Sequence, residues 1–161
     1  MTLTTPTMQR PPRAGERAPD FTLPSTSGES VSLDSFRGRA PVLIAFFPLA
    51  FTSVCTAELC DMGTEWDEFV ATGVRVLPIS VDAVPSLREF KAKHRMPFDL
   101  LSDFKREASR AYGVLDEERF LSRRAYFLVD RDGTLRWTHV EEHGGMKRDN
   151  SELLERIAEL G

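Results

Sequence analysis

The chain has 161 residues, of which 41% are hydrophobic and 29% charged, and its formal net charge is −4. This length suits one domain with a core of its own, and the composition argues against a disordered, fibrous or membrane protein. The basic residues are scattered rather than grouped, so neither nucleic acid nor an anionic membrane surface is a predicted partner.

Residues 1–13 are rich in Thr and Pro and lack the apolar stretch of a secretory signal peptide. We predict a flexible tail here, followed by one domain over residues 14–161. No run of about 18 apolar residues occurs in the sequence, so no membrane span is expected and the predicted location is the cytoplasm. Cysteines there stay reduced, which favours catalysis or redox sensing over a structural disulfide.

The first predicted elements are strands. Residues 15–23 have the pattern of an extended segment, residues 25–30 form a turn cluster, and residues 31–33 return as a short strand, which predicts an amino-terminal hairpin. Residues 41–47 (PVLIAFF) form a continuous apolar run rich in β-branched and aromatic residues. Such a run is typical of a strand covered on both faces, so we expect it at the centre of the sheet.

A strand–loop–helix unit follows. Apolar residues recur at helical spacing from Cys55 to Val70, which predicts one helix with Cys55 at its start. Residues 74–81 (VRVLPISV) predict a second buried strand. Residues 84–94 predict a helix with Pro85 in its first turn.

The remaining pattern continues the alternation over residues 98–101, 106–112 and 126–130. Residues 130–133 (DRDG) predict a hairpin turn that joins strands 126–129 and 134–140 as antiparallel neighbours. A final helix is expected after a cap at Asn150 or Ser151, with an apolar face formed by Leu153, Leu154, Ile157 and Leu160. This order predicts an α/β, thioredoxin-like fold, in which helices flank a central mixed sheet and an amino-terminal hairpin is added.

The surroundings of Cys55 favour a reactive thiol. A thiol attacks as its thiolate, and the free N–H groups and dipole of a helix amino terminus stabilise that charge. Thr52 stands where a dithiol oxidoreductase carries its other cysteine, and its hydroxyl can donate a hydrogen bond to a thiolate and accept one from a peroxide. Pro48 fixes the loop and is expected to shield the sulfur from bulk water.

The sequence Pro48-x-x-x-Thr52-x-x-Cys55 resembles the active-site signature of the peroxiredoxin family. Four further segments look like their family counterparts: residues 18–21 (APDF), 101–104 (LSDF), 111–114 (AYGV) and 124–130 (RAYFLVD). The resemblance extends from about residue 15 to about residue 140. It implies a thiol-dependent peroxidase in which Cys55 attacks a hydroperoxide and becomes a sulfenic acid.

The resemblance also implies roles for two charged residues. Arg124, placed by its spacing from Phe127, matches the family arginine that points at the cysteine sulfur, and it would stabilise the thiolate and the departing oxygen. A surface arginine in a charged loop is the alternative. Glu58 matches a family position in the first helical turn, where it would pair with an arginine. An acid favoured only by the helix dipole is its alternative.

Cys60 raises the question of how the oxidised cysteine is resolved. The Cys-x4-Cys spacing resembles the bacterioferritin-comigratory, or Q-type, branch, whereas residues 46–52 (FFPLAFT) look like the actinobacterial one-cysteine alkyl hydroperoxide reductase E branch. Five helical residues rise about 7.5 Å and disulfides need α-carbons within roughly 7 Å, so a bond between Cys55 and Cys60 requires local unwinding, which Gly63 would ease. An inert buried Cys60 is the alternative.

The implied partners are a hydroperoxide substrate and a thioredoxin-like or other dithiol reductant, and the chain is expected as a monomer or homodimer with no cofactor and no metal. A non-enzymatic peroxide sensor is an open alternative. So are a hydrolase that pairs Cys55 with His94, His139 or His143, and a zinc site that combines Cys55 and Cys60 with His139 and His143. A disulfide reductase is disfavoured because the Cys-x-x-Cys motif is missing.

Overall fold

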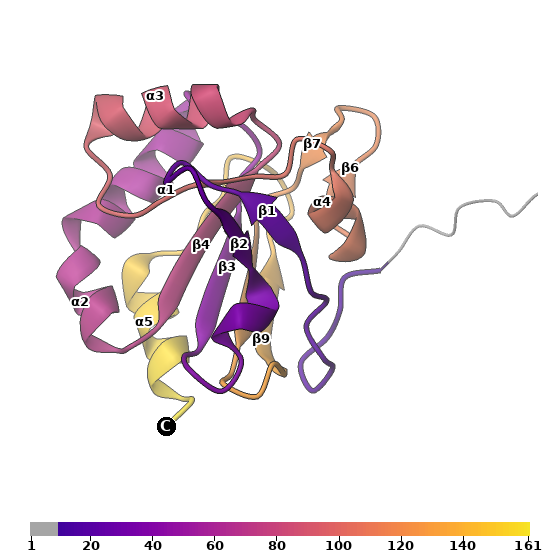
Figure 1. The fold of residues 1–161 in the computed structure, drawn as a ribbon, viewed down its shortest axis with the longest axis vertical. Coiled ribbons are helices and arrows are strands. Elements are labelled where there is room, and N and C mark those ends of the chain that lie inside the picture. The colour runs from indigo at the N-terminus through magenta and orange to yellow at the C-terminus, as the bar shows by residue number, and fades with distance from the viewer. Residues whose placement is uncertain (1–9) are drawn as a thin grey trace, which may run out of the picture.

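A five-stranded mixed sheet lies at the centre of the computed structural model, which describes residues 10–161 (Figure 1). The strand order is β5 (Leu101–Ser102), β4 (Arg75–Ser80), β3 (Val42–Phe46), β8 (Ala125–Val129) and β9 (Leu135–Val140). β3, β4 and β5 run parallel, whereas β8 is antiparallel to both β3 and β9. All five residues of β3 are buried, so the predicted central strand is confirmed.

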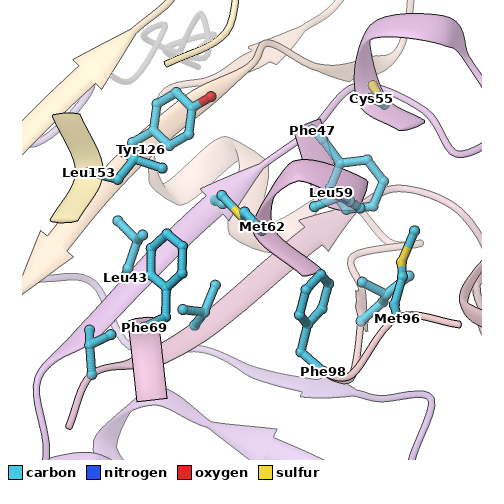
Figure 2. Close-up of a cluster of buried hydrophobic side chains, with 14 of the residues drawn as sticks. Leu43, Phe47, Cys55, Leu59, Met62, Phe69, Met96, Phe98, Tyr126 and Leu153 are labelled. Carbon is cyan, nitrogen blue, oxygen red and sulfur yellow. The ribbon is translucent and has the colours of Figure 1, made fainter. Parts of the chain in front are cut away.

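Side chains of the sheet alternate between two cores. Helices α1 (Ser53–Thr64), α2 (Trp66–Ala71), α3 (Val84–His94) and α5 (Asn150–Ala158) contribute to the core that contains Leu43. Figure 2 shows Cys55 as a member of this cluster, at its periphery and on the same helix as Leu59 and Met62. Because successive strand residues face opposite sides, Val42 and Ile44 belong to the other core.

The second face is covered by smaller elements. These are the hairpin of β1 (Thr22–Pro24) and β2 (Ser30–Ser32), the short 3₁₀ helix η1 (Leu33–Phe36) and helix α4 (Glu107–Ala111) (Figure 1). The predicted α/β class, mixed sheet, flanking helices and amino-terminal hairpin are therefore confirmed. A two-stranded hairpin of β6 (Leu115–Asp116) and β7 (Leu121–Ser122) was not predicted.

The single helix predicted over residues 55–70 is wrong. α1 begins at Ser53 and ends at Thr64, and Glu65 leaves the helical region with φ −107° and ψ 25° before α2 begins. Gly63 weakens the helix just before this break. At the start of α2, the Trp66 ring packs against the Phe98 ring with 5.0 Å between the ring centroids. Leu59 and Met62 of α1 and Phe69 of α2 are all buried, so helical periodicity did not reveal the break.

The carboxyl-terminal part follows the prediction except at one cap. The turn at 130–133 closes with the Gly133 N–H donating to the Asp130 carbonyl at 3.1 Å, and Gly133 has the positive φ that glycine permits. The predicted cap at Asn150 or Ser151 is wrong, because Asp149 precedes α5 and Asn150 is its first residue. The Asn150 amide instead donates to the Asp61 carbonyl at 2.8 Å and ties α5 to α1.

Most of the predicted amino-terminal tail, residues 1–9, lies outside the described residues. Within residues 10–13, Pro12 is buried, and Arg10 forms an ion pair with Glu16. The division of the chain at residue 13 stays a prediction. From residue 10 onward, none of the helices has both the length and the apolar character needed to cross a bilayer.

Candidate active site

Cys55 lies at the amino end of α1, beside the edge of the sheet where β3 ends. The apolar strand stops at Phe46, a loop occupies residues 47–52, and α1 begins at Ser53, so that Cys55 is in its first turn. Only 1% of Cys55 is exposed. The predicted place at a helix start is confirmed, and it puts a buried thiol where helix N–H groups favour a negative charge.

Arg124 is in contact with the Cys55 sulfur. It directly precedes β8, the neighbour of β3, and its Nη2 donates to Cys55 Sγ at 3.1 Å and to the Gly144 carbonyl at 3.2 Å. Arg124 is buried, whereas Arg123 is exposed and donates to the Glu141 carbonyl. The alternative of a surface arginine therefore does not apply.

Glu58 is the ionic partner of Arg124. It lies one helical turn after Cys55 on α1, and its Oε2 accepts a hydrogen bond from Arg124 Nη1, with both side chains almost fully buried. Burial raises the pKa of Glu58, and the charge of Arg124 opposes this effect. Burial acts to lower the pKa of Arg124, but Glu58 and Cys55 outweigh it and raise that pKa, so the guanidinium stays charged.

Thr52 and Pro48 belong to the loop in front of the sulfur. The Thr52 hydroxyl donates to the Leu49 carbonyl at 2.7 Å and not to Cys55, so the predicted hydrogen bond to the thiolate is absent. The hydroxyl has only one proton, and the bond to the Leu49 carbonyl uses it. The oxygen lone pairs of Thr52 remain available to accept a bond. Pro48 is half-buried.

An open cleft brings these groups together. It has a volume of about 590 Å³, and Pro48, Thr52, Cys55 and Arg124 all line it. The site thus places a buried sulfur, a fixed positive charge and a hydroxyl acceptor at one surface. This arrangement suits attack by sulfur on a small polar molecule in which negative charge develops.

Residues 14–138 match the sequence model described as the AhpC/TSA family. The chain belongs to this family of peroxiredoxins. Peroxiredoxin Bcp of Escherichia coli K12 is 38% identical over 131 residues, which is 78% of this chain and 83% of that protein. Alkyl hydroperoxide reductase E of Mycobacterium tuberculosis H37Rv is 37% identical over 135 residues, covering 83% of this chain and 88% of that protein.

Solved peroxiredoxin structures have the same thioredoxin-like fold. The reduced 2-Cys peroxiredoxin of Plasmodium vivax superposes with a TM-score of 0.86 at 30% identity, covering 93% of this chain and 82% of that one. Mycobacterium tuberculosis AhpC superposes with a TM-score of 0.83 at 25% identity, covering 93% of each chain. Together with the sequence relatives, these likenesses make this peroxiredoxin a thiol-dependent peroxidase. They favour the enzyme over the sensor and hydrolase alternatives.

The second cysteine of the peroxiredoxin lies away from the cleft. Cys60 is partly exposed further along α1, is not among the residues that line the cleft, and is a free thiol like Cys55. Burial, and secondarily the neighbouring Asp61 carboxylate, raise the pKa of Cys60. The structure therefore does not bring the two sulfurs together while α1 is intact.

The histidines of the alternative readings are dispersed. His94 packs edge-on against Phe90, His139 stacks on Trp137, and His143 is exposed at the cleft. In residues 10–161, no group of three or more His, Cys, Asp or Glu side chains is arranged to hold a metal ion. The zinc alternative thus lacks a ligand set in this part of the chain.

Several supporting groups of this peroxiredoxin escaped the sequence reasoning. The Gly144 carbonyl contacts Arg124, and the segment that carries it is fixed by Glu141, whose carboxylate accepts two hydrogen bonds from Arg148 at 2.6 and 3.2 Å. The Tyr126 hydroxyl accepts a bond from the Arg148 backbone N–H. Tyr126 lies in the family-like segment 124–130, but no motif or periodicity marks its contact with Arg148 or the roles of Gly144, Glu141 and Arg148, because these depend on contacts between distant segments.

Replacing Glu58 by glutamine tests the buried ion pair. The amide keeps the shape but removes the charge opposite Arg124, so we expect the free energy of unfolding to fall by about 3 kcal/mol. We also expect the rate of Cys55 oxidation to fall on the order of tenfold, because Arg124 loses its anchor. Urea unfolding and stopped-flow oxidation measure the two effects. A Glu68→Gln variant, which changes an exposed acid of α2, is the control, and equal behaviour of both variants contradicts the prediction.

Proposed function

We propose that Cys55 is the peroxidatic cysteine and that Arg124, Glu58, Thr52 and Pro48 assist it. The observation that carries this proposal is the 3.1 Å contact between Arg124 Nη2 and Cys55 Sγ in a cleft open to solvent. A permanently charged guanidinium stabilises the thiolate without itself acting as an acid. Glu58 keeps that guanidinium in place through the other nitrogen, Nη1.

The chemical step forms one bond and breaks one. The Cys55 thiolate attacks the terminal oxygen of the hydroperoxide, the O–O bond breaks, and the S–O bond of a sulfenic acid forms. The departing oxygen leaves with the electron pair of the broken bond and takes a proton from solvent, giving water or an alcohol. Arg124 stabilises the charge on that oxygen, and Thr52 accepts a hydrogen bond from the peroxide O–H.

The substrates proposed are hydrogen peroxide and organic hydroperoxides. The cleft volume of about 590 Å³ leaves room for an alkyl group beyond the reacting oxygens. Steady consumption of peroxide in the presence of a dithiol reductant is the direct assay. Oxidation of one equivalent without turnover would instead favour the peroxide sensor, which passes the oxidation to a partner.

Cys60 is the proposed resolving residue. Its thiol condenses with the Cys55 sulfenic acid, which forms the disulfide and releases water, and a thioredoxin-like dithiol then reduces the disulfide by exchange. Because five helical residues rise about 7.5 Å, the first turns of α1 must unwind for this step. The intact α1 and the position of Cys60 outside the cleft favour the second candidate, a one-cysteine peroxidase with Cys60 inert.

A Cys60→Ser variant decides between these two mechanisms. One equivalent of peroxide is expected to remove both thiols of the wild type, with loss of two hydrogen atoms by intact mass, whereas the variant keeps one added oxygen. The thiolate is the attacking form, and the pKa of Cys60 is raised, so disulfide formation should accelerate with rising pH through the alkaline range. A wild type that retains its Cys60 thiol after oxidation refutes the resolving role.

The partners and setting are proposed from the same chemistry. A thioredoxin-like or other dithiol protein serves as reductant, and the chain acts in the cytoplasm as a monomer or homodimer. Residues 14–161 form the catalytic domain. Pull-down of mixed disulfides and sedimentation analysis test the reductant and the oligomeric state respectively.

A further inference from the structure

The loop between β3 and α1, residues 47–52, adopts a conformation that its own sequence disfavours. Phe51 has φ +67°, in the left-handed region. A bulky side chain there costs free energy, and such a residue persists only where surrounding contacts hold it. The same loop carries Pro48 and Thr52, so whatever holds the loop also places two groups that line the cleft.

Contacts from other elements hold this loop, and three of them come from side chains of β7, of α3 and of the turn after β4. The Ser122 hydroxyl donates to the Phe47 carbonyl at 3.1 Å, and the Phe51 ring packs 4.9 Å from the Phe90 ring. The third contact is to a charged group, because the Ala50 N–H donates to Asp82 Oδ2 at 2.8 Å. Hydrogen bonds to an ionised acceptor are the stronger kind, and this one fixes the backbone beside the strained residue.

Asp82 is itself held rigidly. The Ser80 hydroxyl donates to Asp82 Oδ2 at 2.7 Å, and the Ser102 hydroxyl donates to the Asp82 carbonyl at 2.6 Å. Ser80 and Ser102 are buried and pair with each other across β4 and β5. The carboxylate is therefore built into the edge of the sheet and does not swing freely from a loop.

The topology explains why Asp82 reaches the loop. β3 and β4 are parallel, so the residues that follow each strand meet at the same edge of the sheet. The loop follows β3, and Asp82 comes two residues after β4 ends at Ser80. Asp82 is not among the residues that line the cleft, so it acts through the loop and not on the substrate.

We propose that Asp82 is a positioning residue of the peroxidase, which holds the loop at Ala50 so that Pro48 and Thr52 face the Cys55 sulfur. The proposal rests on the proposed roles of these three residues. Removing the carboxylate frees the Ala50 N–H and lets the loop leave its strained conformation. The thiol and Arg124 keep their contact, because neither belongs to this loop.

Two reactions of Cys55 distinguish a positioning role of Asp82 from a general disturbance of the structure. Oxidation by hydrogen peroxide needs the loop groups in place, whereas alkylation by iodoacetamide needs only an accessible thiolate. For Asp82→Ala we expect the second-order rate of peroxide oxidation to fall about 10- to 100-fold and the alkylation rate to change less than about threefold. Asp82→Asn keeps an acceptor oxygen and is expected to recover most of the peroxide rate.

Two further variants complete the test. Asp99→Ala removes a carboxylate that likewise accepts a hydroxyl bond, from Thr26, but lies outside the site, and it should keep the wild-type rates. If Asp82→Ala does not fold, Ser80→Ala, which frees the carboxylate to rotate, should lower the peroxide rate about threefold or more with unchanged alkylation.

An Asp82→Ala variant that keeps the wild-type peroxide rate, or that loses peroxide and alkylation rates by the same factor, overturns the proposal. If Asp82→Ala does not fold, an unchanged peroxide oxidation rate in Ser80→Ala also overturns the proposal. These results leave the peroxidase function intact as long as the wild type reacts with peroxide. A wild type without that reaction refutes the proposed function instead.

Discussion

A Cys55→Ser variant is expected to lose peroxide reduction by a factor on the order of 10⁴ or more. A serine hydroxyl is not ionised near neutral pH and is a far weaker nucleophile than a thiolate. The replacement is nearly isosteric, and the Arg124 nitrogen that contacts the sulfur can donate to the new oxygen. We therefore expect the fold to be kept, with a change of no more than about 1 kcal/mol in the free energy of unfolding.

The measurement is stopped-flow oxidation combined with intact mass after one equivalent of hydrogen peroxide. Cys60→Ser is the matched control, because it also removes one thiol from α1 but leaves Cys55, and it should keep the fast first oxidation. If a Cys55→Ser variant still consumes peroxide in the presence of a dithiol reductant, the nucleophile is a residue other than Cys55.

Replacing Arg124 is expected to have the second largest effect. An Arg124→Met variant should lower kcat/KM for peroxide by about 10²–10³, because the charge that faces both the sulfur and the departing oxygen is gone. Arg124→Lys should recover only part of this loss. The planar guanidinium of Arg124 donates hydrogen bonds to Glu58, Cys55 and the Gly144 carbonyl at once. The ammonium group of a lysine is a point charge and cannot reproduce this geometry.

In Arg124→Met, the loss of folding stability must be measured separately from the loss of catalytic activity. Arg124→Met leaves the Glu58 carboxylate buried without its partner, which is expected to cost about 3–5 kcal/mol. The double variant Arg124→Met with Glu58→Gln removes that penalty and should regain stability but not activity. Arg123→Met, which changes the exposed neighbour, should lower kcat/KM at most about threefold. Recovery of activity in the double variant would contradict a direct role of the guanidinium.

The elements that the sequence predicted best are those whose signal is local. The apolar run of residues 41–47 predicted the central strand, and the turn at 130–133 predicted the antiparallel pair of β8 and β9. The spacing of Pro48, Thr52 and Cys55 predicted the loop and helix start of the site. In each case the residues that carry the signal are also the residues that form the element.

Some predictions failed where a polar side chain can form its hydrogen bond with either of two partners. Asn150 or Ser151 was expected to cap α5, but the Asn150 amide donates to the Asp61 carbonyl on α1. The Thr52 hydroxyl is able to donate to a thiolate or to accept from a peroxide, but in the structure it donates to the Leu49 carbonyl. The break at Glu65 was missed because α1 and α2 share one helical periodicity.

The sequence by itself determined the fold class, the family resemblance and the candidate nucleophile, because the residues that carry strand patterning and the Pro48-Thr52-Cys55 spacing lie close together in the chain. Only the tertiary structure decided that Arg124 is buried against the sulfur, that Glu58 pairs with Arg124, and that Asp82 accepts a hydrogen bond from the loop. These contacts join residues 32 to 69 positions apart. Their existence depends on sheet order and packing, which no local pattern of residues specifies.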